Sequence, residues 1–230
     1  MKRVLCLLTA AVLLMGITAC QRKAPPQRAE PVPVVTETAE SAQRLPEPAD
    51  SDFVKITDYI PTARQELLYA TDRNFTGQVI YDFEDAYLRY GTVKKLMAVS
   101  RDLEFMGMYL KIWDGFRPVS AQFKLWEVCP DPTYVANPNV GHSSHSRGNT
   151  VDVTLVDANG VEFEMPTGFD DFSPRADRDY SDCTENGANN AEILEILMEK
   201  HGFEGYFGEW WHFSDMDSYP VEDVFHPPVN

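Results

Sequence analysis

The segment SSHSRGNTVDVTL, residues 143–155, is the part of the chain around which the rest is organised. Its second half alternates aliphatic with polar side chains, which is the pattern of a strand with one face in a core. Successive side chains of a strand point to opposite faces, so we expect Asp152 on the face away from its aliphatic neighbours. His145 stands seven residues before Asp152. The segment therefore predicts a core strand with a carboxylate directed into a cleft and a histidine nearby.

The flanking sequence predicts further strands and three helices. Asn159-Gly160 is a strong hairpin signal directly after the central strand. Further strands are expected at 53–60, 65–70, 108–113, 161–165 and 205–213. Apolar residues at helical spacing predict helices over 88–106, 118–128 and 190–201. Helices and antiparallel strands interleave without a βαβ rhythm, so we expect a single-domain α+β fold with a mixed or antiparallel sheet and flanking helices.

The N-terminus has the pattern of an export signal. Lys2 and Arg3 precede an apolar run over residues 4–15, which is typical of a secretory signal peptide and short for a membrane-spanning helix. The small residues before Cys20 resemble a bacterial lipoprotein cleavage site, so we expect residues 1–19 to be removed and Cys20 to be lipidated. An ordinary signal peptide followed by a coincidental cysteine is the alternative.

The segment after Cys20 differs in composition from the rest of the chain. Residues 21–50 contain six prolines and no aromatic residue. Such a segment cannot bury enough apolar surface to offset the entropy lost on ordering, so residues 20–50 are expected to be a disordered linker behind the anchor. The folded domain is then expected at 51–230, lipid-anchored to a bacterial membrane and exposed in the periplasm or at the cell surface.

The composition narrows the choice of partners. The formal net charge is −16 at pH 7, and cleavage after residue 19 would change it to −18. Such a surface argues against binding to nucleic acid or to anionic lipid and wall polymers, whereas a small zwitterion is compatible with it. We expect a small-molecule substrate, a membrane contact only through the lipid, and no protein partner.

Two cysteines, Cys129 and Cys183, remain in the expected domain. They do not form a Cys-x-x-Cys pair, so a structural zinc knuckle is not expected. In an exported protein a disulfide between them is one outcome and two free thiols are the other, and geometry decides between these.

A second histidine with its own carboxylate stands near the C-terminus, in Glu209-Trp210-Trp211-His212. Together with the central segment it completes the parts of a catalytic zinc site, which needs three protein ligands, an open position and a nearby base. We expect one Zn²⁺ bound by His145, Asp152 and His212, with Glu209 as the base. Residues three apart do not share a face on a regular strand, so a bend or bulge is expected near Glu209.

The residues alone leave alternatives open. His145 and His212 could be structural histidines without a metal, and His142 is a rival ligand. A His/carboxylate site would also accept other divalent ions. Arg117, after the strand at 108–113, is either a surface charge or an oxyanion stabiliser at the edge of the cleft.

Four motifs together resemble a known family. They are YATDRNFTG at 69–77, WDGFRP at 113–118, SSHSRG at 143–148 with Asp152, and EWWH at 209–212. In this order they are similar to the D-alanyl-D-alanine dipeptidases, the zinc dipeptidases of vancomycin resistance. The resemblance implies the α+β fold shared with zinc D-Ala-D-Ala carboxypeptidases and the hedgehog signalling domain.

The resemblance also implies roles for individual residues. It makes Glu209 the catalytic acid and base and Arg117 the transition-state stabiliser, beside the same zinc ligands. It implies substrate contacts by Tyr69, Tyr81, Ser143 and Asp170. Asp170 would pair with the free ammonium of a dipeptide and so restrict the enzyme to dipeptides.

The expected function is zinc-dependent hydrolysis of D-alanyl-D-alanine to D-alanine outside the cytoplasm. One alternative is a D,D-carboxypeptidase or endopeptidase that trims peptidoglycan stem peptides. Another is a non-catalytic zinc-binding lipoprotein of the cell wall. In the resistance pathway the dipeptide is destroyed in the cytoplasm, so the export signal favours wall turnover or recycling of D-alanine.

Overall fold

The computed structural model describes residues 47–229. The expected signal peptide, Cys20 and nearly all of the expected linker lie outside these residues. Within 47–229, no helix combines the length and the apolar character needed to cross a membrane.

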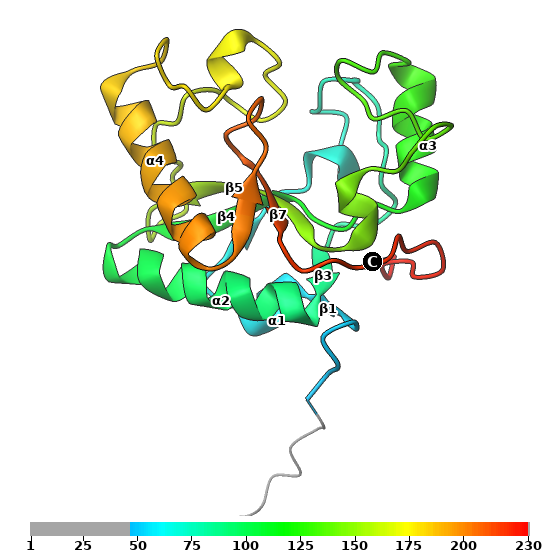
Figure 1. Cartoon of the computed structure of the whole chain (residues 1–230), viewed down its shortest axis with the longest axis horizontal. Coiled ribbons are helices and arrows are strands. Elements are labelled where there is room, and N and C mark those ends of the chain that lie inside the picture. The colour runs from blue at the N-terminus through cyan, green and yellow to red at the C-terminus, as the bar shows by residue number, and fades with distance from the viewer. Residues whose placement is uncertain (1–46, 230) are drawn as a thin grey trace, which may run out of the picture. The chain divides into compact units, whose positions relative to one another are not determined.

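The strands of the described residues form two sheets (Figure 1). The smaller sheet pairs β1 with β3 antiparallel, and the larger has the order β2-β4-β5-β7-β6. In the larger sheet β2 runs parallel to β4 and the other neighbours are antiparallel. The strands are β1 (Phe53–Lys55), β2 (Arg64–Gln65), β3 (Tyr87–Arg89), β4 (Tyr109–Asp114), β5 (Thr150–Val156), β6 (Phe203–Gly205) and β7 (His212–Asp215).

Helices cover the larger sheet, which confirms the α+β class. The α-helices are α1 (Ile56–Tyr59), α2 (Tyr90–Phe105), α3 (Val119–Val128) and α4 (Glu185–Lys200). Short 3₁₀ turns are η1 (Leu68–Ala70), η2 (Ser144–Arg147) and η3 (Pro174–Ala176). The α2 helix packs against both β4 and α4. In Figure 1, α4 lies at the left of the view beside the large sheet and α3 lies at the right.

The central strand β5 has the environment that its sequence predicts. All seven of its residues are buried, and the side chains of Val151, Val153 and Leu155 are 0% exposed. It lies between β4 and β7. The strand therefore carries Asp152 into the middle of the molecule, where only a cavity between other elements can give access to it.

Two expected strands near the start of the chain are shorter than predicted. The region 53–60 is a three-residue strand followed directly by α1, because Ile56 enters the core as the first residue of a helical turn. The region 65–70 divides into β2, which ends at Gln65, and the 3₁₀ turn η1. Alternation over so few residues does not distinguish a strand from a helical turn.

The expected strand at 161–165 is reduced to one bridge, between Val156 and Glu162. The turn before it does form, with Gly160 at φ 84°. The Asp157 side chain accepts hydrogen bonds from the main-chain N–H groups of Asn159 and Val161, which makes this a compact loop. The strand expected at 205–213 is also divided, into β6 and β7 with a loop between them.

Candidate active site

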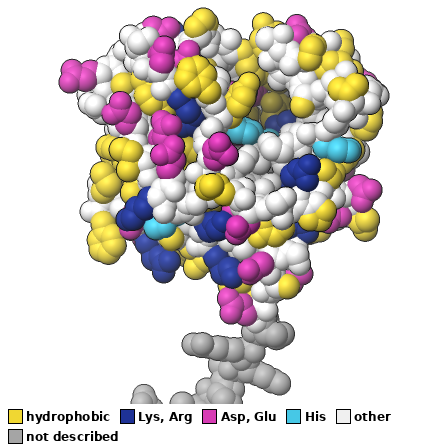
Figure 2. Space-filling model, in the orientation of Figure 1, with side chains coloured by type: hydrophobic (Ala, Val, Ile, Leu, Met, Phe, Trp, Pro, Cys, Tyr) yellow, Lys and Arg dark blue, Asp and Glu magenta, His cyan; other side chains and the backbone are white. Residues whose placement is uncertain are grey.

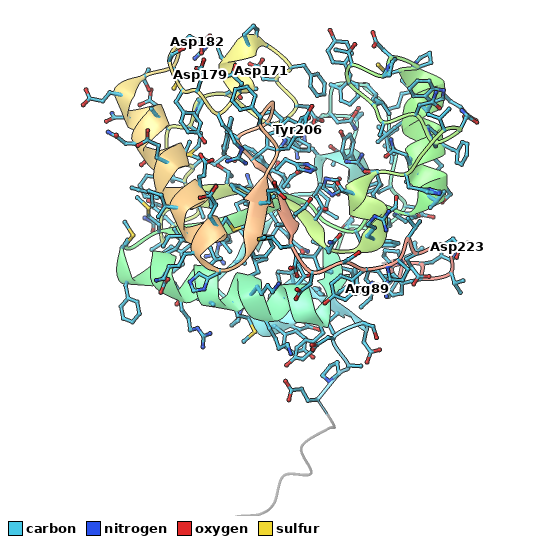
Figure 3. The ribbon with its side chains drawn as sticks, viewed as in Figure 1. Arg89, Asp171, Asp179, Asp182, Tyr206 and Asp223 are labelled. Carbon is cyan, nitrogen blue, oxygen red and sulfur yellow. The ribbon has the colours of Figure 1, made fainter. Side chains whose placement is uncertain are left out.

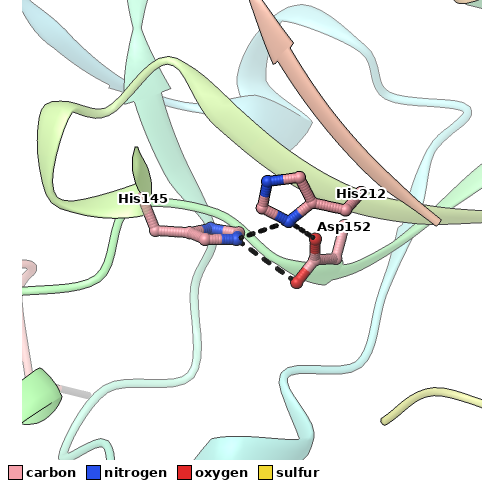
Figure 4. Close-up of side chains that lie close together, drawn as sticks. All are labelled: His145, Asp152 and His212. Carbon is pink, nitrogen blue, oxygen red and sulfur yellow. Dashed lines mark hydrogen bonds and ion pairs between the residues drawn. The ribbon is translucent and has the colours of Figure 1, made fainter. Parts of the chain in front are cut away.

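The three side chains predicted as metal ligands meet in the structure. His145 Nε2 lies 3.4 Å from Asp152 Oδ2 and 3.4 Å from His212 Nδ1 (Figure 4). Asp152 Oδ1 lies 3.1 Å from His212 Nδ1. Among the described residues, these three form the one group of histidine, cysteine and acidic side chains with ligand atoms within 4.8 Å of one another.

Strand pairing brings two members of this group together. Asp152 and His212 are direct partners in the antiparallel β5–β7 pair. Side chains directly opposite each other on neighbouring strands project from the same face of the sheet. Although 60 positions separate them in the sequence, their relative position is therefore set by main-chain hydrogen bonds.

The third member comes from the turn before β5. His145 lies in η2, and the chain leaves that turn through Gly148 at φ 74°. A Cβ atom on Gly148 would lie 2.4 Å from Phe53 Cε1, so both the conformation and the space require glycine. The Ser-Arg-Gly part of the central motif thus serves to return the chain from His145 to the strand that carries Asp152.

The geometry of the group fits a tetrahedral zinc ion. Ligand atoms about 2.0–2.1 Å from zinc are about 3.3 Å apart in a tetrahedron, and the three separations here are 3.1–3.4 Å. His145 Nδ1 donates to the Gly115 carbonyl oxygen at 2.8 Å, which leaves Nε2 free to bind a metal. Asp152 Oδ1 is buried and accepts no hydrogen bond from the described residues, as expected for an atom reserved for a metal.

The rival ligand His142 is not a member of this group. It lines the same cavity, but it is exposed and its ring atoms do not lie among the three ligand atoms.

Glu209 lies beside the ligand group, in the loop that joins β6 to β7. Its Oε2 atom is 3.5 Å from His212 Nδ1. The His212 main-chain N–H donates to the Glu209 carbonyl oxygen at 3.3 Å, so the chain turns here, as the three-residue spacing predicted. Burial raises the pKa of the Glu209 carboxyl, while His212 opposes the shift. A half-buried carboxyl with a raised pKa at this position suits proton transfer.

Arg117 reaches the cavity from the turn after β4. Its Nη2 and Nε atoms donate to Asp114 Oδ2 at 2.7 and 3.3 Å, and its Nη1 donates to Gln122 Oε1 at 3.0 Å. Asp114 is fully buried, and its Oδ1 accepts from the Gly115 main-chain N–H at 2.8 Å. The guanidinium is therefore held in one orientation at the cavity wall, and it is not a freely moving surface charge.

The position of Tyr81 differs from the one that the resemblance implied. Its side chain is buried and is not part of the cavity wall. Its hydroxyl donates to Asp114 Oδ1 at 2.8 Å and accepts from Arg117 Nε at 3.1 Å. Because this hydroxyl completes the hydrogen bonding of a buried carboxylate, Tyr81 supports Arg117 from behind and does not contact the cavity.

The other three expected substrate contacts, Tyr69, Ser143 and Asp170, do line the cavity. Asp170 Oδ2 accepts a hydrogen bond from the Tyr69 hydroxyl at 2.8 Å. Burial raises the pKa of the Asp170 carboxyl to about 8. Asp170 also has φ 56°, a left-handed conformation that is uncommon outside glycine and occurs at functional sites.

All these groups surround one cavity of about 310 Å³. In Figure 2 it is the hollow on the face shown, with a histidine side chain at its floor. The sequence did not predict several wall residues from loops: Pro132, Thr133, Tyr134, Ala136, Phe172 and Tyr206. Ring contacts join two of them, Tyr134 and Phe172, at 4.9 Å. The sequence feature that could have indicated these wall residues is the presence of aromatic residues in two proline- or glycine-containing loops. The sequence does not show, however, which loops meet.

The two cysteines are free in the structure. Cys129 follows α3 and Cys183 precedes the first residue of α4 by two positions, and these helices lie on opposite sides of the molecule (Figure 1). A disulfide between them would need Cα atoms within about 7 Å. Of the two outcomes left open by the sequence, the structure has the free thiols.

Comparison with known proteins finds several relatives that carry the same name, D-alanyl-D-alanine dipeptidase. A D-alanyl-D-alanine dipeptidase of Escherichia coli (strain K12) is 35% identical over 173 residues, which are 74% of this chain and 89% of the relative. One from Enterococcus faecalis (strain ATCC 700802 / V583) is 30% identical over 198 residues, 76% of this chain and 96% of the relative.

Solved structures with partial similarity include two of VanY-type enzymes. A mutant of the vancomycin-resistance D,D-pentapeptidase VanY in complex with Zn(II) aligns with a TM-score of 0.39 at 15% identity, over 57% of this chain and 74% of the other. VanYB in complex with D-alanine-D-alanine aligns with a TM-score of 0.39 at 18% identity, over 62% and 80%.

A family model described as D-Ala-D-Ala dipeptidase, Peptidase_M15, matches residues 49–228. This range contains the whole cavity and nearly all of the described residues. The chain therefore belongs to the D-Ala-D-Ala dipeptidase family of metallopeptidases.

Proposed function

We propose that this protein hydrolyses the dipeptide D-alanyl-D-alanine with one zinc ion held by His145, Asp152 and His212. The observation that carries the proposal is that one small cavity brings together this ligand group, a carboxyl base, an arginine and a further half-buried carboxyl, that of Asp170. Membership of a dipeptidase family supports it further.

A zinc ion bound by this group would lower the pKa of a water molecule and polarise the scissile carbonyl group. Glu209 is placed to accept the proton of the attacking water and to return it to the leaving amine. Arg117, held by Asp114 at the cavity wall, supplies fixed positive charge for the carbonyl oxygen as it becomes negative. Because the guanidinium is already oriented, this stabilisation needs no rearrangement during the reaction.

The substrate end of the cavity suits a short peptide with a free ammonium group. Asp170 offers one half-buried carboxyl, which accepts a hydrogen bond from the Tyr69 hydroxyl, and an ammonium that pairs with it would favour its ionised form. A volume of about 310 Å³ is at the lower end for a ligand site, since such sites span about 300–1,000 Å³. A longer peptide would carry an amide nitrogen in place of the ammonium, and Asp170 would have no cation to favour its ionised form.

The test compares free D-alanyl-D-alanine with a peptidoglycan stem pentapeptide as substrates of the zinc-loaded protein. We expect D-alanine release from the dipeptide, loss of activity with a chelator, recovery with zinc, and loss in the Glu209→Ala variant. Glu204→Ala is the matched control, because Glu204 lies in the same hairpin on β6 but is exposed.

Three results would contradict parts of this proposal. Faster cleavage of the pentapeptide would make the protein a D,D-carboxypeptidase. Binding of either peptide without release of D-alanine would leave a binding protein. Activity that survives Glu209→Ala would remove Glu209 from the mechanism.

We also propose that the enzyme acts outside the cytoplasm, anchored through lipid on Cys20. The support is the sequence of residues 1–20, with its basic start, apolar run and small residues before the cysteine. Incorporation of labelled fatty acid into the parent but not into the Cys20→Ser variant is the expected result. Equal labelling of the two would reject the anchor.

A further inference from the structure

Arg178 joins two loops that carry different parts of the site. The hairpin loop, residues 206–211, connects β6 to β7 and bears Glu209. Arg178 Nε donates to the Tyr206 carbonyl oxygen at 2.8 Å. Its Nη2 donates to the carbonyl oxygens of Trp210 and His212 at 3.1 and 2.9 Å. One guanidinium therefore binds the main chain on both sides of Glu209 and at the ligand His212.

The surroundings of Arg178 are built to hold a guanidinium. The side chain is 5% exposed and lies over the Phe213 ring, with Cζ 4.3 Å from the ring centroid. The Glu195 carboxylate on α4 lies 3.4 Å from Nη1 and balances the charge. A Cβ atom on Gly205 would lie 2.3 Å from Arg178 Cζ, so the strand before the hairpin loop needs glycine to admit the side chain. A buried charge with this many fixed partners is unusual for a surface loop.

Arg178 comes from the same loop as Asp170, the carboxyl at the substrate end of the cavity. Two further main-chain bonds join this loop to the hairpin loop: the Arg178 N–H donates to the Phe207 carbonyl oxygen at 2.9 Å, and the Trp210 N–H donates to the Ala176 carbonyl oxygen at 2.9 Å. Figure 3 shows Tyr206 near the tip of the hairpin, beside the loop that carries Asp171, Asp179 and Asp182. The two loops are therefore fastened together next to the cavity.

We propose that Arg178 is a positioning residue, which sets the places of Glu209 and His212 through their main chain and ties them to the Asp170 loop. This deepens the proposed function and rests on it for the roles of Glu209 and His212. The Arg178 side chain does not line the cavity, so it acts without touching substrate. The planar guanidinium explains why this residue is an arginine. Its N–H groups point in fixed directions and reach three carbonyl oxygens at once, whereas a lysine ammonium cannot hold the three in one fixed geometry.

The test replaces the fork but keeps the charge, with Arg178→Lys. We expect a folded protein in which kcat for D-alanyl-D-alanine falls about 10- to 100-fold, the range typical for loss of an outer partner of a metal ligand. KM should change less than about threefold, because the cavity wall keeps its residues. Zinc affinity, measured by chelator competition without any peptide, should fall at least about tenfold through His212.

Arg175→Lys is the matched control. Arg175 lies in the same loop, and its Nη2 donates to a single carbonyl oxygen, that of Pro166 at 3.1 Å, away from the hairpin loop. Its kcat and zinc affinity should stay within twofold of the parent. Glu195→Gln, which keeps Arg178 but removes the carboxylate beside it, should lower kcat and zinc affinity in the same direction by a smaller factor.

Several outcomes would overturn the inference. A folded Arg178→Lys protein with parental kcat and zinc affinity would do so, and so would an equal loss in Arg175→Lys. If neither Arg178→Lys nor Glu195→Gln folds, judged by circular dichroism, the residue serves stability and not positioning. Weaker zinc binding by Arg178→Lys, with no dipeptidase activity in the parent, would support the positioning role and reject the proposed function instead.

Discussion

Two sides of the cavity are held in different ways: the metal side, with the proposed zinc ligands, and the substrate side, with the proposed ammonium partner Asp170. On the metal side, Asp152 and His212 are direct partners in the β5–β7 pair, so a ladder of main-chain hydrogen bonds fixes them. On the substrate side, Asp170 and Phe172 stand on a loop without a ladder. That side depends on side-chain contacts, such as the 2.8 Å hydrogen bond from Tyr69 to Asp170.

This contrast separates two properties of the enzyme. Two of the three proposed metal ligands, Asp152 and His212, stand on paired strands, so their separation depends mainly on the sheet, while His145 stands on the turn before β5. The proposed recognition of the substrate's free end depends on loops, whose contacts can be altered while the sheet stays intact. Glu209 stands between these cases, because it lies on a loop that Arg178 fastens through main-chain carbonyl groups.

The largest effect is expected on the metal side, from Asp152→Asn. The amide keeps the shape of the side chain but removes the negative charge that faces the two imidazoles. Loss of a hydrogen-bond partner of a metal ligand lowers metal affinity by up to about 100-fold, and loss of a ligand should lower zinc affinity by more than that. Dipeptidase activity should then be lost at micromolar zinc. Isothermal titration with zinc measures the first effect directly.

Asp157→Asn is its control, one residue beyond the end of β5 and away from the cavity. We expect zinc affinity like that of the parent. Tight zinc binding by Asp152→Asn would show that the sheet does not define the metal site in the way described.

The next effect concerns Arg117, which belongs to neither side, since Asp114 holds it on the turn after β4. In Arg117→Lys we expect kcat to fall about 10²- to 10³-fold, as for loss of an oxyanion donor. Zinc content should be unchanged, because the Arg117 side chain bonds to Asp114 and Gln122 and not to the three ligands, and lysine keeps the main-chain N–H that donates to the His145 carbonyl oxygen at 3.3 Å. Steady-state kinetics and metal analysis of the same sample measure kcat and zinc content separately. A parallel loss of zinc would assign Arg117 to the metal side.

The smallest effect on the reaction is expected on the substrate side, from Asp170→Asn. Loss of one hydrogen bond to a charged group is worth about 1.5–3 kcal/mol, so KM for the dipeptide should rise about 10- to 150-fold. Zinc affinity should remain that of the parent. An unchanged KM would remove Asp170 from recognition of the ammonium group.

The same variant should be more stable than the parent at alkaline pH. The pKa of Asp170 is raised to about 8 in the folded protein, against about 3.9 in an unfolded chain. Between these values the folded state holds the extra proton, so the parent's free energy of unfolding falls as pH rises from about 4 to about 8 and is level above that. Asparagine does not titrate, so the advantage of Asp170→Asn should be absent near pH 4 and largest above pH 8.

Thermal unfolding of the metal-free proteins at pH 5 and pH 8.5 measures this difference. Each kcal/mol corresponds to about 2–4 °C for a chain of this size. A gap in Tm that does not widen between the two pH values would contradict the raised pKa of Asp170 in the folded protein.

Sequence patterns predicted the metal side well for a physical reason. The alternation in β5 reflects a strand with a full core face, and Asp152 follows from that alternation. The spacing of Glu209 and His212 predicted a departure from regular strand, which the hairpin loop confirms. Both are consequences of local periodicity.

The substrate side could not be predicted in the same way. The left-handed conformation of Asp170 and the burial of Tyr81 behind Arg117 depend on contacts between distant segments. Nothing in the sequence near Arg178 shows that its guanidinium enters a hairpin about thirty residues later. The strand expected at 161–165 does not form for a related reason. Hydrogen bonds that the Asp157 carboxylate accepts favour a compact loop over further strand pairing.

The cross-strand pairing of Asp152 with His212 also determines when the enzyme can become active during its synthesis. Because β7 begins at His212, a nascent segment that ends before residue 212 lacks one member of the ligand group. Closing this pair is a long-range event, which is slow compared with formation of the local helices. Zinc captured by the finished pair then favours the folded state by mass action. In the proposed mechanism, zinc binding therefore waits for synthesis through residue 212 and for closure of the β5–β7 pair.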